Sequence, residues 1–414
     1  MNETLNLGGT KEPMKILVLN SGSSSLKFQL FELSDLTVIA SGLIERIGGE
    51  QSPVRLTFYD SAGTEQILKK DVSVSEHGRA IAIMSELLRE SETMTNFQEL
   101  AGIGHRVVHG GESFHEPTLI NEAVIEAIEE LVLLAPLHNP ANLIGIRAAM
   151  EHAPTVPQVA VFDTAFHQSI PEHGYLYALP YTLYEQHKVR RYGFHGTSHN
   201  YVAKQAAEHL GALLGELNII TLHLGNGSSA AAIQGGQCID TSMGLTPLEG
   251  LIMGTRSGDL DPAILLYLAR ETGMTIGVLD EMLNKMSGLK GICGENDMRT
   301  ITKLSEQGNH QARLALTMFC YRLKKYIGAY IAALGGVDCI VFTGGIGENS
   351  TIVRQLSCQG LERLGIRLDG KNNALRQEGI LEIQSADSPV KILVVPTDEE
   401  LEIATQTLQV IITN

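Results

Sequence analysis

The feature that most restricts the fold of this chain is a short segment that occurs twice. Leu17 to Glu32 reads "LVLNSGSSSLKFQLFE", in which two apolar, strand-like runs flank five small residues. Asn218 to Gly236 reads "NIITLHLGNGSSAAAIQGG" and repeats the order of strand, glycine and serine turn, and strand. Two copies favour a duplicated fold in which each half of the chain contributes one hairpin.

The length of the chain favours two domains. Its 414 residues exceed the size at which a single hydrophobic core usually stops growing. We expect a polar N-terminal arm over residues 1–13, an N-terminal lobe over residues 14–165 plus 399–414, and a C-terminal lobe over residues 166–398.

Composition excludes several classes of partner. The formal net charge of −16 argues against binding to nucleic acid or to an anionic membrane surface. No apolar run approaches the ~20 residues that span a bilayer, and the N-terminus lacks the apolar centre of a signal peptide. Five widely spaced cysteines without a CxxC pair suit a reducing compartment and argue against a zinc ribbon. We therefore expect no membrane association and a cytoplasmic location.

The pattern between and after the two hairpins alternates helices with strands. It predicts helices over residues 122–134, 140–151, 200–214, 262–270, 310–334 and 399–411, and strands over residues 158–163, 338–343 and 390–396. Such alternation is typical of an α/β protein whose sheets are covered by helices. The last helix follows the second half of the chain, yet it can return to the first half.

The small-residue turns have two interpretations. One is a tight hairpin in which glycine supplies the positive φ. The other is an anion cradle, in which backbone N–H groups and hydroxyls hold a phosphate. Lys27 follows the first turn and Asn226 lies in the second, and a third glycine-rich turn at 344–347 separates a strand from a predicted helix. Three such turns favour a nucleotide.

Two segments imitate other nucleotide motifs. "GIRLDGKN", Gly365 to Asn372, has the spacing of a Walker A loop, but Asn372 replaces the serine or threonine that would hold Mg²⁺. "GNGSSA", Gly225 to Ala230, matches a dinucleotide fingerprint, which must open a full helix. Only a few apolar residues separate it from Gly235 and Gly236, so a nicotinamide site is not expected.

Two arginines and one aspartate stand in apolar or glycine-rich surroundings. Arg106 ends a predicted buried strand, where a structural ion pair explains it as well as a functional role does. Arg256 lies between Gly254 and Gly258 in a loop, a setting typical of functional arginines. Asp163 ends a strand, where α/β sheets often place ligand-binding carboxylates, although a helix N-cap is the competing interpretation.

The histidines and the terminal acidic run are less specific. His195 and His199 lie four residues apart but lack the glutamate of an HExxH zinc site, so a hydrogen-bonding histidine at a helix start is the better interpretation. His138 lies between prolines in a rigid turn. The acids at 398–400 are typical of a helix N-terminus, and one of them could also serve Mg²⁺.

Nine motifs occur in the order seen in one family. They are "NSGSSSLKFQ", "GHRVVHGGE", "PLHNP", "VFDTAFH", "YGFHGTSH", "HLGNGSS", "GTRSGDLDP", "GGIGENS" and "PTDEE". In these motifs the chain resembles the acetate kinases from Met14 to its C-terminus. The resemblance implies a two-lobed actin-like ATPase fold with a duplicated βββαβαβα core, assembled as a homodimer. It also implies reversible in-line phosphoryl transfer from ATP to acetate, which gives ADP and acetyl phosphate.

The resemblance assigns roles to single residues. The catalytic residues it implies are Asp163, His195, Arg256 and Arg106. The substrate site it implies comprises Arg106, Val108, Leu137, His138, Phe194 and Pro247. The nucleotide site it implies, in the C-terminal lobe apart from Lys27, comprises Lys27, His223, Leu224, Gly225, Asn226, Gly227, Asp297, Met298, Arg299, Gly345, Ile346, Gly347, Glu348 and Asn349. The metal ligands it implies are Asn20 and Glu399, for Mg²⁺ or alternatively Mn²⁺. Residues 1–13 have no counterpart in the family pattern.

The implied reaction makes electrostatic demands. A carboxylate is already ionised at neutral pH, so no base is needed to create the nucleophile. Two unit charges 4 Å apart interact by roughly 4 kcal/mol at an effective dielectric of about 20. Arg106, Arg256, His195 and Mg²⁺ would offset the repulsion between acetate and ATP and stabilise the transferring group. Two roles stay open for Asp163, a base or a residue that positions the metal and the arginines, and neither substrate requires deprotonation.

Three alternatives remain open on the sequence. A propionate or other short-chain acyl kinase would use the same chemistry, because one or two methylenes change binding by only ~1 to 3 kcal/mol. A non-catalytic nucleotide sensor would not need both arginines. A metal hydrolase built on His195, His199 and Asp163 would require bound zinc.

Overall fold

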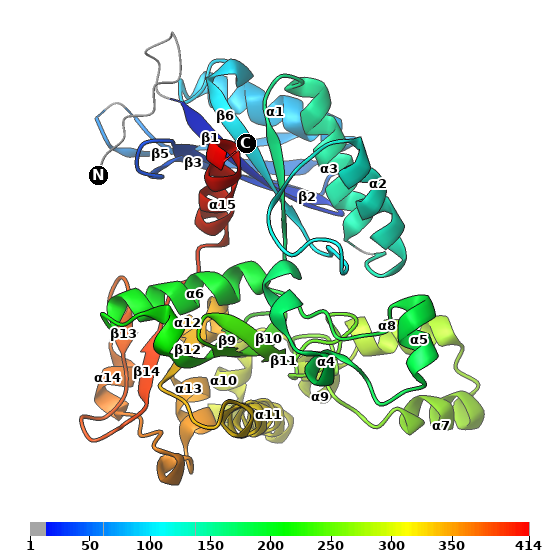
Figure 1. Ribbon diagram of the computed structural model, residues 1–414, viewed down its shortest axis with the longest axis vertical. Coiled ribbons are helices and arrows are strands. Elements are labelled where there is room, and N and C mark those ends of the chain that lie inside the picture. The colour runs from blue at the N-terminus through cyan, green and yellow to red at the C-terminus, as the bar shows by residue number, and fades with distance from the viewer. Residues whose placement is uncertain (1–13, 61, 137, 414) are drawn as a thin grey trace. The chain divides into compact units, whose positions relative to one another are not determined.

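The backbone forms two compact units. The computed structural model describes residues 14–60, 62–136 and 138–413 (Figure 1). The first unit contains the chain up to Gly110, Glu116–Phe162 and the residues from Glu400 onward, and the second contains Gly111–His115 and Asp163–Glu399. The N-terminal arm expected over residues 1–13 lies outside the described residues.

An eight-stranded sheet is the centre of the first unit. Its strand order is β5-β4-β3-β2-β1-β6-β8-β7. The strands are β1 (Lys15–Gly22), β2 (Ser25–Glu32), β3 (Val38–Glu45), β4 (Ser52–Tyr59), β5 (Glu65–Val72), β6 (Leu100–Val107), β7 (Thr118–Leu119) and β8 (Gln158–Phe162). β1 and β2 are antiparallel, with Asn20 paired to Lys27, whereas β1 and β6 are parallel. The first small-residue segment is thus a β-hairpin, as its pattern predicts.

A six-stranded sheet is the centre of the second unit. Its strand order is β11-β10-β9-β12-β14-β13. The strands are β9 (Asn218–Leu224), β10 (Ser228–Gln234), β11 (Gln237–Thr241), β12 (Cys339–Thr343), β13 (Leu381–Glu382) and β14 (Lys391–Val394). β9 and β10 pair in antiparallel fashion from Asn218 to Leu224, so the "GNGSSA" segment opens a strand and not a helix.

The two sheets repeat one topology. In the order β3-β2-β1-β6-β8 the first three strands are antiparallel neighbours, and β1, β6 and β8 are parallel. The order β11-β10-β9-β12-β14 has the same directions. This correspondence confirms the α/β class and the duplicated core that the two matching hairpins predict.

Helices connect and cover the strands. In the first unit they are α1 (His77–Glu90), α2 (Glu122–Glu130), α3 (Asn139–His152) and most of α15 (Glu399–Thr413), with 3₁₀ turns η1 (Phe97–Glu99) and η2 (Leu131–Leu133). In the second unit they are α4 (Glu172–Tyr175), α5 (Tyr181–His187), α6 (Gly196–His209), α7 (Ala263–Thr272), α8 (Ile276–Lys285), α9 (Gly288–Cys293), α10 (Met298–Glu306), α11 (His310–Leu334), α12 (Gly344–Asn349), α13 (Thr351–Cys358) and α14 (Gly370–Ala374), with η3 (Ala165–Ser169), η4 (Leu214–Glu216) and η5 (Glu362–Leu364). Within the described parts of the chain, no helix combines the length and the apolar character needed to cross a bilayer.

The last helix packs on the first sheet. Ile403 and Ala404 of α15 belong to one buried cluster with Ile16 and Val18 of β1, and Figure 1 shows α15 beside this strand. Glycine on β6 makes the close approach possible, because a Cβ atom at Gly104 would lie 2.3 Å from Thr407 Oγ1. The final segment of the chain thus completes the domain that the first segment begins.

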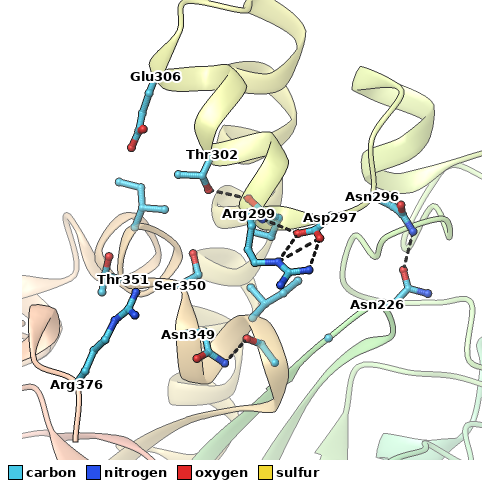
Figure 2. Close-up of a pocket in the computed structure, with 15 residues that line it drawn as sticks. Asn226, Asn296, Asp297, Arg299, Thr302, Glu306, Asn349, Ser350, Thr351 and Arg376 are labelled. Atoms are coloured by element: carbon cyan, nitrogen blue, oxygen red, sulfur yellow. Dashed lines mark hydrogen bonds and ion pairs between the residues drawn. The ribbon is translucent and has the colours of Figure 1, made fainter. Parts of the chain in front are cut away.

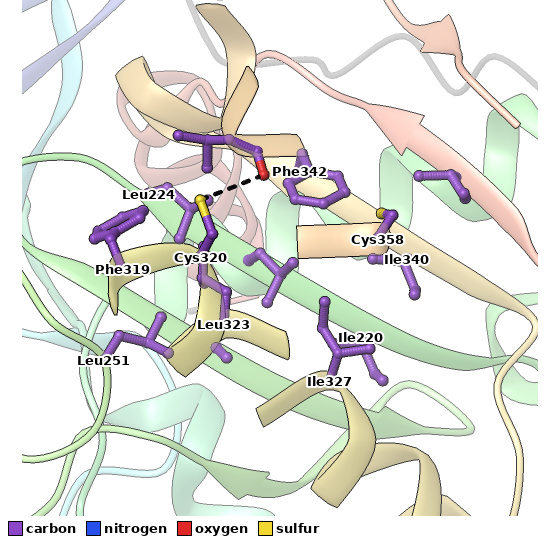
Figure 3. Close-up of a cluster of buried hydrophobic side chains, with 14 of the residues drawn as sticks. Ile220, Leu224, Leu251, Phe319, Cys320, Leu323, Ile327, Ile340, Phe342 and Cys358 are labelled. Carbon is purple, nitrogen blue, oxygen red and sulfur yellow. Dashed lines mark hydrogen bonds between the residues drawn. The ribbon is translucent and has the colours of Figure 1, made fainter. Parts of the chain in front are cut away.

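The second sheet packs against the long helix α11, whose bounds are those that the sequence predicts. Figure 3 shows Phe319, Leu323 and Ile327 of α11 in one cluster with Ile220 of β9 and Phe342 of β12. All five side chains are almost fully buried. Burial of such side chains stabilises each by about 1.5 to 3 kcal/mol, so this layer is the main core of the second unit.

Three predicted elements differ from the structure. The helix predicted over 122–134 is α2, which ends at Glu130 and is followed by the 3₁₀ turn η2. The helix predicted over 200–214 is α6, which begins at Gly196 because His195 is its N-cap and ends at His209, shortly before Gly211 (φ 63) turns the chain. The third glycine-rich turn is itself the helix α12, because Gly344 (φ 73) bends the chain directly after β12 and its N–H donates to Glu348 Oε1 at 3.0 Å. Helix α6 therefore begins directly after His195, and helix α12 contains the predicted site residues Gly345 and Asn349.

Candidate active site

The turn between β9 and β10 is held by short-range bonds. The N–H of Gly225 donates to the carbonyl of Gly227 at 2.9 Å, and Ser228 Oγ donates to the carbonyl of Gly225 at 3.2 Å. The N–H of Gly254 donates to the carbonyl of Asn226 at 2.9 Å, and a Cβ atom at Gly254 would lie 2.0 Å from Asn226 Oδ1. Glycine at position 254 therefore allows the loop that contains Arg256 to approach this turn.

A pocket of about 940 Å³ begins at the same turn (Figure 2). Its walls come from the β9–β10 turn, helix α10 and the two residues before it, helix α12, the start of α13 and the loop after α14. The lining residues are Gly225, Asn226, Asn296, Asp297, Met298, Arg299, Thr302, Glu306, Gly345, Ile346, Asn349, Ser350, Thr351, Ile352 and Arg376. A cavity of this size and mixed polarity fits a nucleoside-sized ligand.

An ion pair stands on one wall of the pocket. Asp297 is the N-cap of α10, and its Oδ1 accepts the backbone N–H of Arg299 at 2.8 Å. The guanidinium of Arg299 donates to both carboxylate oxygens, and these hydrogen bonds lower the pKa of Asp297 to about 2. The Arg299 side chain is 90% exposed, so it can move toward a ligand without a large cost in burial.

Arg256 is a partly buried cation with neutral partners. Its Nη1 donates to the carbonyl of Pro247 at 2.8 Å and lies 3.6 Å from Met253 Sδ. Burial lowers the pKa of Arg256. No carboxylate in the described part of the chain forms an ion pair with this guanidinium. Because a buried charge is costly without a counter-charge, the position favours an anionic ligand.

His195 is held in an unusual backbone conformation. It is the N-cap of α6 with φ 59 and ψ 24, a left-handed conformation that costs energy for any residue except glycine. The next residue is Gly196, where a Cβ atom would lie 2.2 Å from the carbonyl oxygen of Asp163. The His195 ring stacks on His223 with centroids 4.3 Å apart, and its Nδ1 lies 2.8 Å from Ser229 Oγ. The surroundings thus fix both the backbone and the ring.

His195 and Arg256 border the same glycine. A Cβ atom at Gly227 would lie 3.5 Å from His195 Nε2 and 3.8 Å from Arg256 Nη1. Gly227 directly follows Gly225 and Asn226, which line the pocket. One turn therefore connects the pocket to two hydrogen-bond donors.

A hydroxyl chain connects His223 to the pocket helix. Ser198 Oγ lies 2.8 Å from His223 Nδ1 and 2.7 Å from Thr397 Oγ1. The N–H of Thr397 donates to Glu348 Oε1, which also accepts the N–H of Gly344 at the start of α12. The sequence interpretation missed Ser198 and Thr397, whose only signal is their place inside the "YGFHGTSH" and "PTDEE" motifs.

The nucleotide residues named from the sequence divide into two groups. Eight of them line the pocket: Gly225, Asn226, Asp297, Met298, Arg299, Gly345, Ile346 and Asn349. Five lie beside it in the second unit: His223, Leu224, Gly227, Gly347 and Glu348. The sequence interpretation missed the other lining residues: Asn296, Thr302, Glu306, Ser350, Thr351, Ile352 and Arg376. Their roles, like those of the named residues, stay predictions.

A buried arginine supports the pocket helix. Arg354 donates to the carbonyls of Gly347 and Glu348 at 2.9 and 2.8 Å and to Asn373 Oδ1 at 2.7 Å. Burial lowers its pKa to about 10. The sequence interpretation did not single out this residue. Its bonds fix the C-terminal end of α12 to α14.

Asp163 is buried directly after β8. Its carbonyl accepts the N–H of Gly196 at 2.9 Å, and Thr197 Oγ1 lies 3.5 Å from its Oδ1. Thr164, not Asp163, is the N-cap of the following 3₁₀ turn. The competing interpretation of Asp163 as the cap of that turn is therefore wrong.

The remaining predicted residues are divided between the two units. Arg106 Nη1 donates to Asn20 Oδ1 at 3.4 Å, and Lys27 Nζ pairs with Glu400 Oε1 at 2.6 Å. His138 is the N-cap of α3, and the N–H of Val108 donates to Asn142 at 3.1 Å. The second unit contains Phe194, Pro247 and Glu399. Leu137 lies outside the described residues.

The residues fit Mg²⁺ better than zinc. Across the described ranges, no three histidine, cysteine, aspartate or glutamate side chains are grouped so that they could hold a metal ion. Mg²⁺ commonly binds through one or two protein oxygens while substrate phosphates and water supply the rest. Asn20 in the first unit and Glu399 in the second carry an amide oxygen and a carboxylate, which are donor types that Mg²⁺ accepts, and their assignment to a metal stays a prediction. The zinc hydrolase alternative has no such support.

Comparison with known proteins decides the family. A model of the acetokinase family matches residues 15–405. The chain belongs to the acetokinase family. It is 55% identical over 399 residues to the acetate kinase of Syntrophobacter fumaroxidans, with 96% of this chain and 97% of the relative covered. It is 54% identical over 398 residues to the acetate kinase of Campylobacter lari, with 96% and 99% covered.

Solved structures of this family have the same fold. The acetate kinase of Porphyromonas gingivalis is 46% identical and superimposes with a TM-score of 0.90, over 96% of this chain and 99% of that one. A propionate kinase from Francisella tularensis is 42% identical with a TM-score of 0.89, over 96% and 99%. The family thus includes proteins named for two neighbouring carboxylic acids.

Proposed function

We propose that this member of the acetokinase family transfers the γ-phosphoryl group of ATP to acetate, reversibly and in line, giving acetyl phosphate and ADP. The observation that carries the proposal is the β9–β10 turn. Gly225 and Asn226 line the pocket, and Gly227 borders both His195 and Arg256. A nucleotide in this pocket would direct its terminal phosphate toward two hydrogen-bond donors.

The chain's own residues perform electrostatic work in this reaction. Arg256, partly buried beside a carbonyl oxygen and a thioether sulfur, stabilises negative charge on the transferring phosphoryl group. His195 donates a hydrogen bond to the same group. Arg106 holds the carboxylate of acetate, while Val108, Leu137, His138, Phe194 and Pro247 contact the rest of the acid. Asp163 is buried, and its backbone carbonyl accepts the N–H of Gly196. This hydrogen bond positions the start of α6.

We assign Asn20 and Glu399 to Mg²⁺, with Mn²⁺ as the alternative ion. When bound, the ion neutralises charge on the nucleotide phosphates. Lys27 assists at the phosphates if its pair with Glu400 opens, since its side chain is half exposed. Removal of divalent cations by a chelator should abolish turnover, and Mg²⁺ should restore it.

A hydroxylamine trapping assay tests the proposal. The protein is incubated with ATP, Mg²⁺ and acetate, propionate or butyrate, and acyl phosphate is measured as its hydroxamate. We expect acetate to give the highest kcat/KM and propionate a lower but measurable one, because one methylene costs only about 1 to 3 kcal/mol. A preference for propionate would favour the second candidate, a propionate kinase. No hydroxamate with any short-chain acid would overturn the proposal.

We also propose a homodimer in the cytoplasm. Helix α7 has no buried residue in the single chain, and its Ile264, Leu266 and Tyr267 are exposed. Exposed apolar side chains on one element are typical of a contact surface. All five cysteines are unpaired thiols, which accords with a reducing compartment.

A further inference from the structure

Three buried side chains lie in a row behind His195. Ser229 Oγ lies 2.8 Å from His195 Nδ1 and 2.8 Å from His199 Nε2. His199 Nδ1 lies 2.7 Å from Thr221 Oγ1. Ser229, His199 and Thr221 have no exposed surface. The reaction as described above does not use any of these three.

The protons of this row can be assigned from its outer end. Burial and the neighbouring rings of His167 and His223 lower the pKa of His199 well below its ordinary value, so the ring is neutral and carries one N–H. His199 is the one hydrogen-bond partner of the Thr221 hydroxyl within the described ranges. If His199 donated to Thr221, the threonine proton would be buried without an acceptor, which is unfavourable. Thr221 therefore donates to Nδ1 of His199.

The same reasoning assigns the protons of Ser229 and His195. Because Nδ1 of His199 accepts, its single proton is on Nε2 and is donated to Ser229 Oγ. A serine hydroxyl has one proton, so Ser229 donates that proton to Nδ1 of His195. His195 therefore carries its own proton on Nε2, the nitrogen that borders Gly227 and Arg256.

We propose that Ser229, His199 and Thr221 are positioning residues that hold the His195 ring neutral, with its proton on Nε2, as a fixed hydrogen-bond donor. The significance for catalysis rests on the proposed role of His195 in phosphoryl transfer, but the protonation state does not. The row explains why two further hydroxyls and a second histidine are buried behind this ring. Protonation of His195 at Nδ1 would require the donors of the whole row to reverse.

Two groups beside His195 disfavour its protonation, whereas the carboxylate of Asp163, whose Oδ1 accepts from Thr197 Oγ1 at 3.5 Å at the start of α6, acts in the opposite direction. His223 stacks on the ring from β9, and Arg256 borders the same glycine from its loop. A positive guanidinium disfavours a second positive charge nearby. With the ring neutral, its Nε2–H donates equally well across the physiological pH range, where a free histidine would titrate.

Nuclear magnetic resonance of the full chain labelled with ¹⁵N-histidine tests the proposal directly. Two-bond ¹H–¹⁵N correlations show which ring nitrogen carries the proton, and the His195→Asn variant identifies the His195 signals. We expect a neutral ring with Nε2–H from about pH 8 to about pH 6. A wild-type ring that carries its proton on Nδ1, or that becomes doubly protonated in this range, would overturn the proposal.

Two variants distinguish an effect of the hydrogen-bonded row from an effect of packing alone. Ser229→Ala removes the donor to His195, so we expect a mixture of tautomers, protonation at a higher pH, and a kcat about tenfold lower with little change in the KM for ATP. Thr221→Val is nearly isosteric and does not touch His195, yet it should shift the His195 signals in the same direction. If Thr221→Val leaves these signals unchanged, the row does not act as a unit and the proposal fails.

Ser242→Ala is the matched control. Ser242 is also a fully buried serine of the second unit, but its Oγ accepts the N–H of Ala230 at 2.9 Å and not a histidine. It should leave the His195 signals unchanged. Absence of kinase activity in the unmodified chain would contradict the proposed function, whereas the nitrogen signals of His195 would still decide this inference.

Discussion

At the scale of single residues, the two arginines named from the sequence differ in their surroundings. Arg106 contacts the amide oxygen of Asn20 in the first unit, whereas Arg256 is partly buried against a carbonyl and a sulfur atom in the second. Arg354 is more deeply buried, but carbonyl and amide oxygens surround its guanidinium on several sides. Arg256 is therefore the arginine whose charge depends most on an incoming anion.

Arg256→Ala should lower kcat by about 10³ to 10⁵, the range found for an arginine that stabilises a transferring phosphoryl group. Its side chain makes one hydrogen bond to Pro247, so the unfolding temperature should change little. Hydroxamate formation and thermal unfolding measure the two effects. Arg367→Ala, which removes an exposed pair with Asp387, is the control and should keep wild-type activity. Turnover of Arg256→Ala near the wild-type rate would contradict the assignment.

At the scale of elements, glycines decide where helices can pack. Gly102 and Gly104 of β6 leave room for α15, since Cβ atoms there would lie 2.1 Å from Ile411 Cδ1 and 2.3 Å from Thr407 Oγ1. Gly145 of α3 similarly leaves room for Ser21 of β1, with 2.1 Å to its Oγ. Helix packing thus explains the two glycines of the "GIGH" sequence independently of catalysis.

Gly104→Ala should destabilise the first unit by about 1 to 3 kcal/mol, because the added methyl group overpacks the contact with α15. Hydrogen exchange of the amides in α15 should accelerate in this variant. Gly328→Ala is the matched control, since nothing lies within 4 Å of a Cβ atom there. In the middle of α11 it should stabilise the protein by roughly 0.5 to 1 kcal/mol. Equal stability of the two variants would contradict the packing argument.

At the scale of the whole molecule, both units contain buried histidines that resist protonation. Burial lowers the pKa of His105 to about 4 in the first unit and that of His167 to about 4 in the second. His167 Nε2 donates to the carbonyl of Phe194, directly before His195. The Nε2–H of this ring therefore supports the strained N-cap of α6, and its Nδ1 faces the thiol of Cys238.

Acidification should destabilise the protein already at pH values well above the pKa values of its carboxylates. Between pH 6.5 and 4 the unfolded chain binds protons that the native histidines do not, so stability falls as the pH decreases, by up to about 1.4 kcal/mol per pH unit for each histidine. The urea midpoint should be nearly constant from pH 7.5 to 6.5 and then decrease to pH 5. The pKa of Glu99 is lowered to about 2, so its contribution to stability is lost mainly below the ordinary glutamate pKa and adds little above pH 5. A constant midpoint down to pH 5 would contradict this prediction.

Assembly is the second property at this scale. If α7 is covered in a homodimer, Leu266→Glu should give a monomer, because a buried unpaired carboxylate opposes association. Light scattering coupled to size-exclusion chromatography measures the mass. Leu213→Glu places the same charge at another exposed leucine and should leave the assembly unchanged. A dimeric Leu266→Glu variant would exclude this helix as the contact.

The sequence by itself determined the class of the fold and the local chemistry of the site. The amphipathic pattern of residues 310–334 predicted helix α11, and the small-residue turns predicted the two hairpins. Both kinds of element depend on residues that are neighbours in the chain. The nine motifs were sufficient to indicate the family, and they contain six of the fifteen residues that line the pocket. The division into lobes and the roles of the individual site residues stay predictions.

Tertiary structure alone decided the contacts between distant segments. Thr221, Ser229 and His199 come from two strands and a helix, and no local pattern predicts that their polar atoms meet. The same holds for the bonds of Arg354 to α12 and α14. Local backbone preferences follow from neighbours in the chain, whereas hydrogen bonds between buried side chains follow from the packing of the completed sheet.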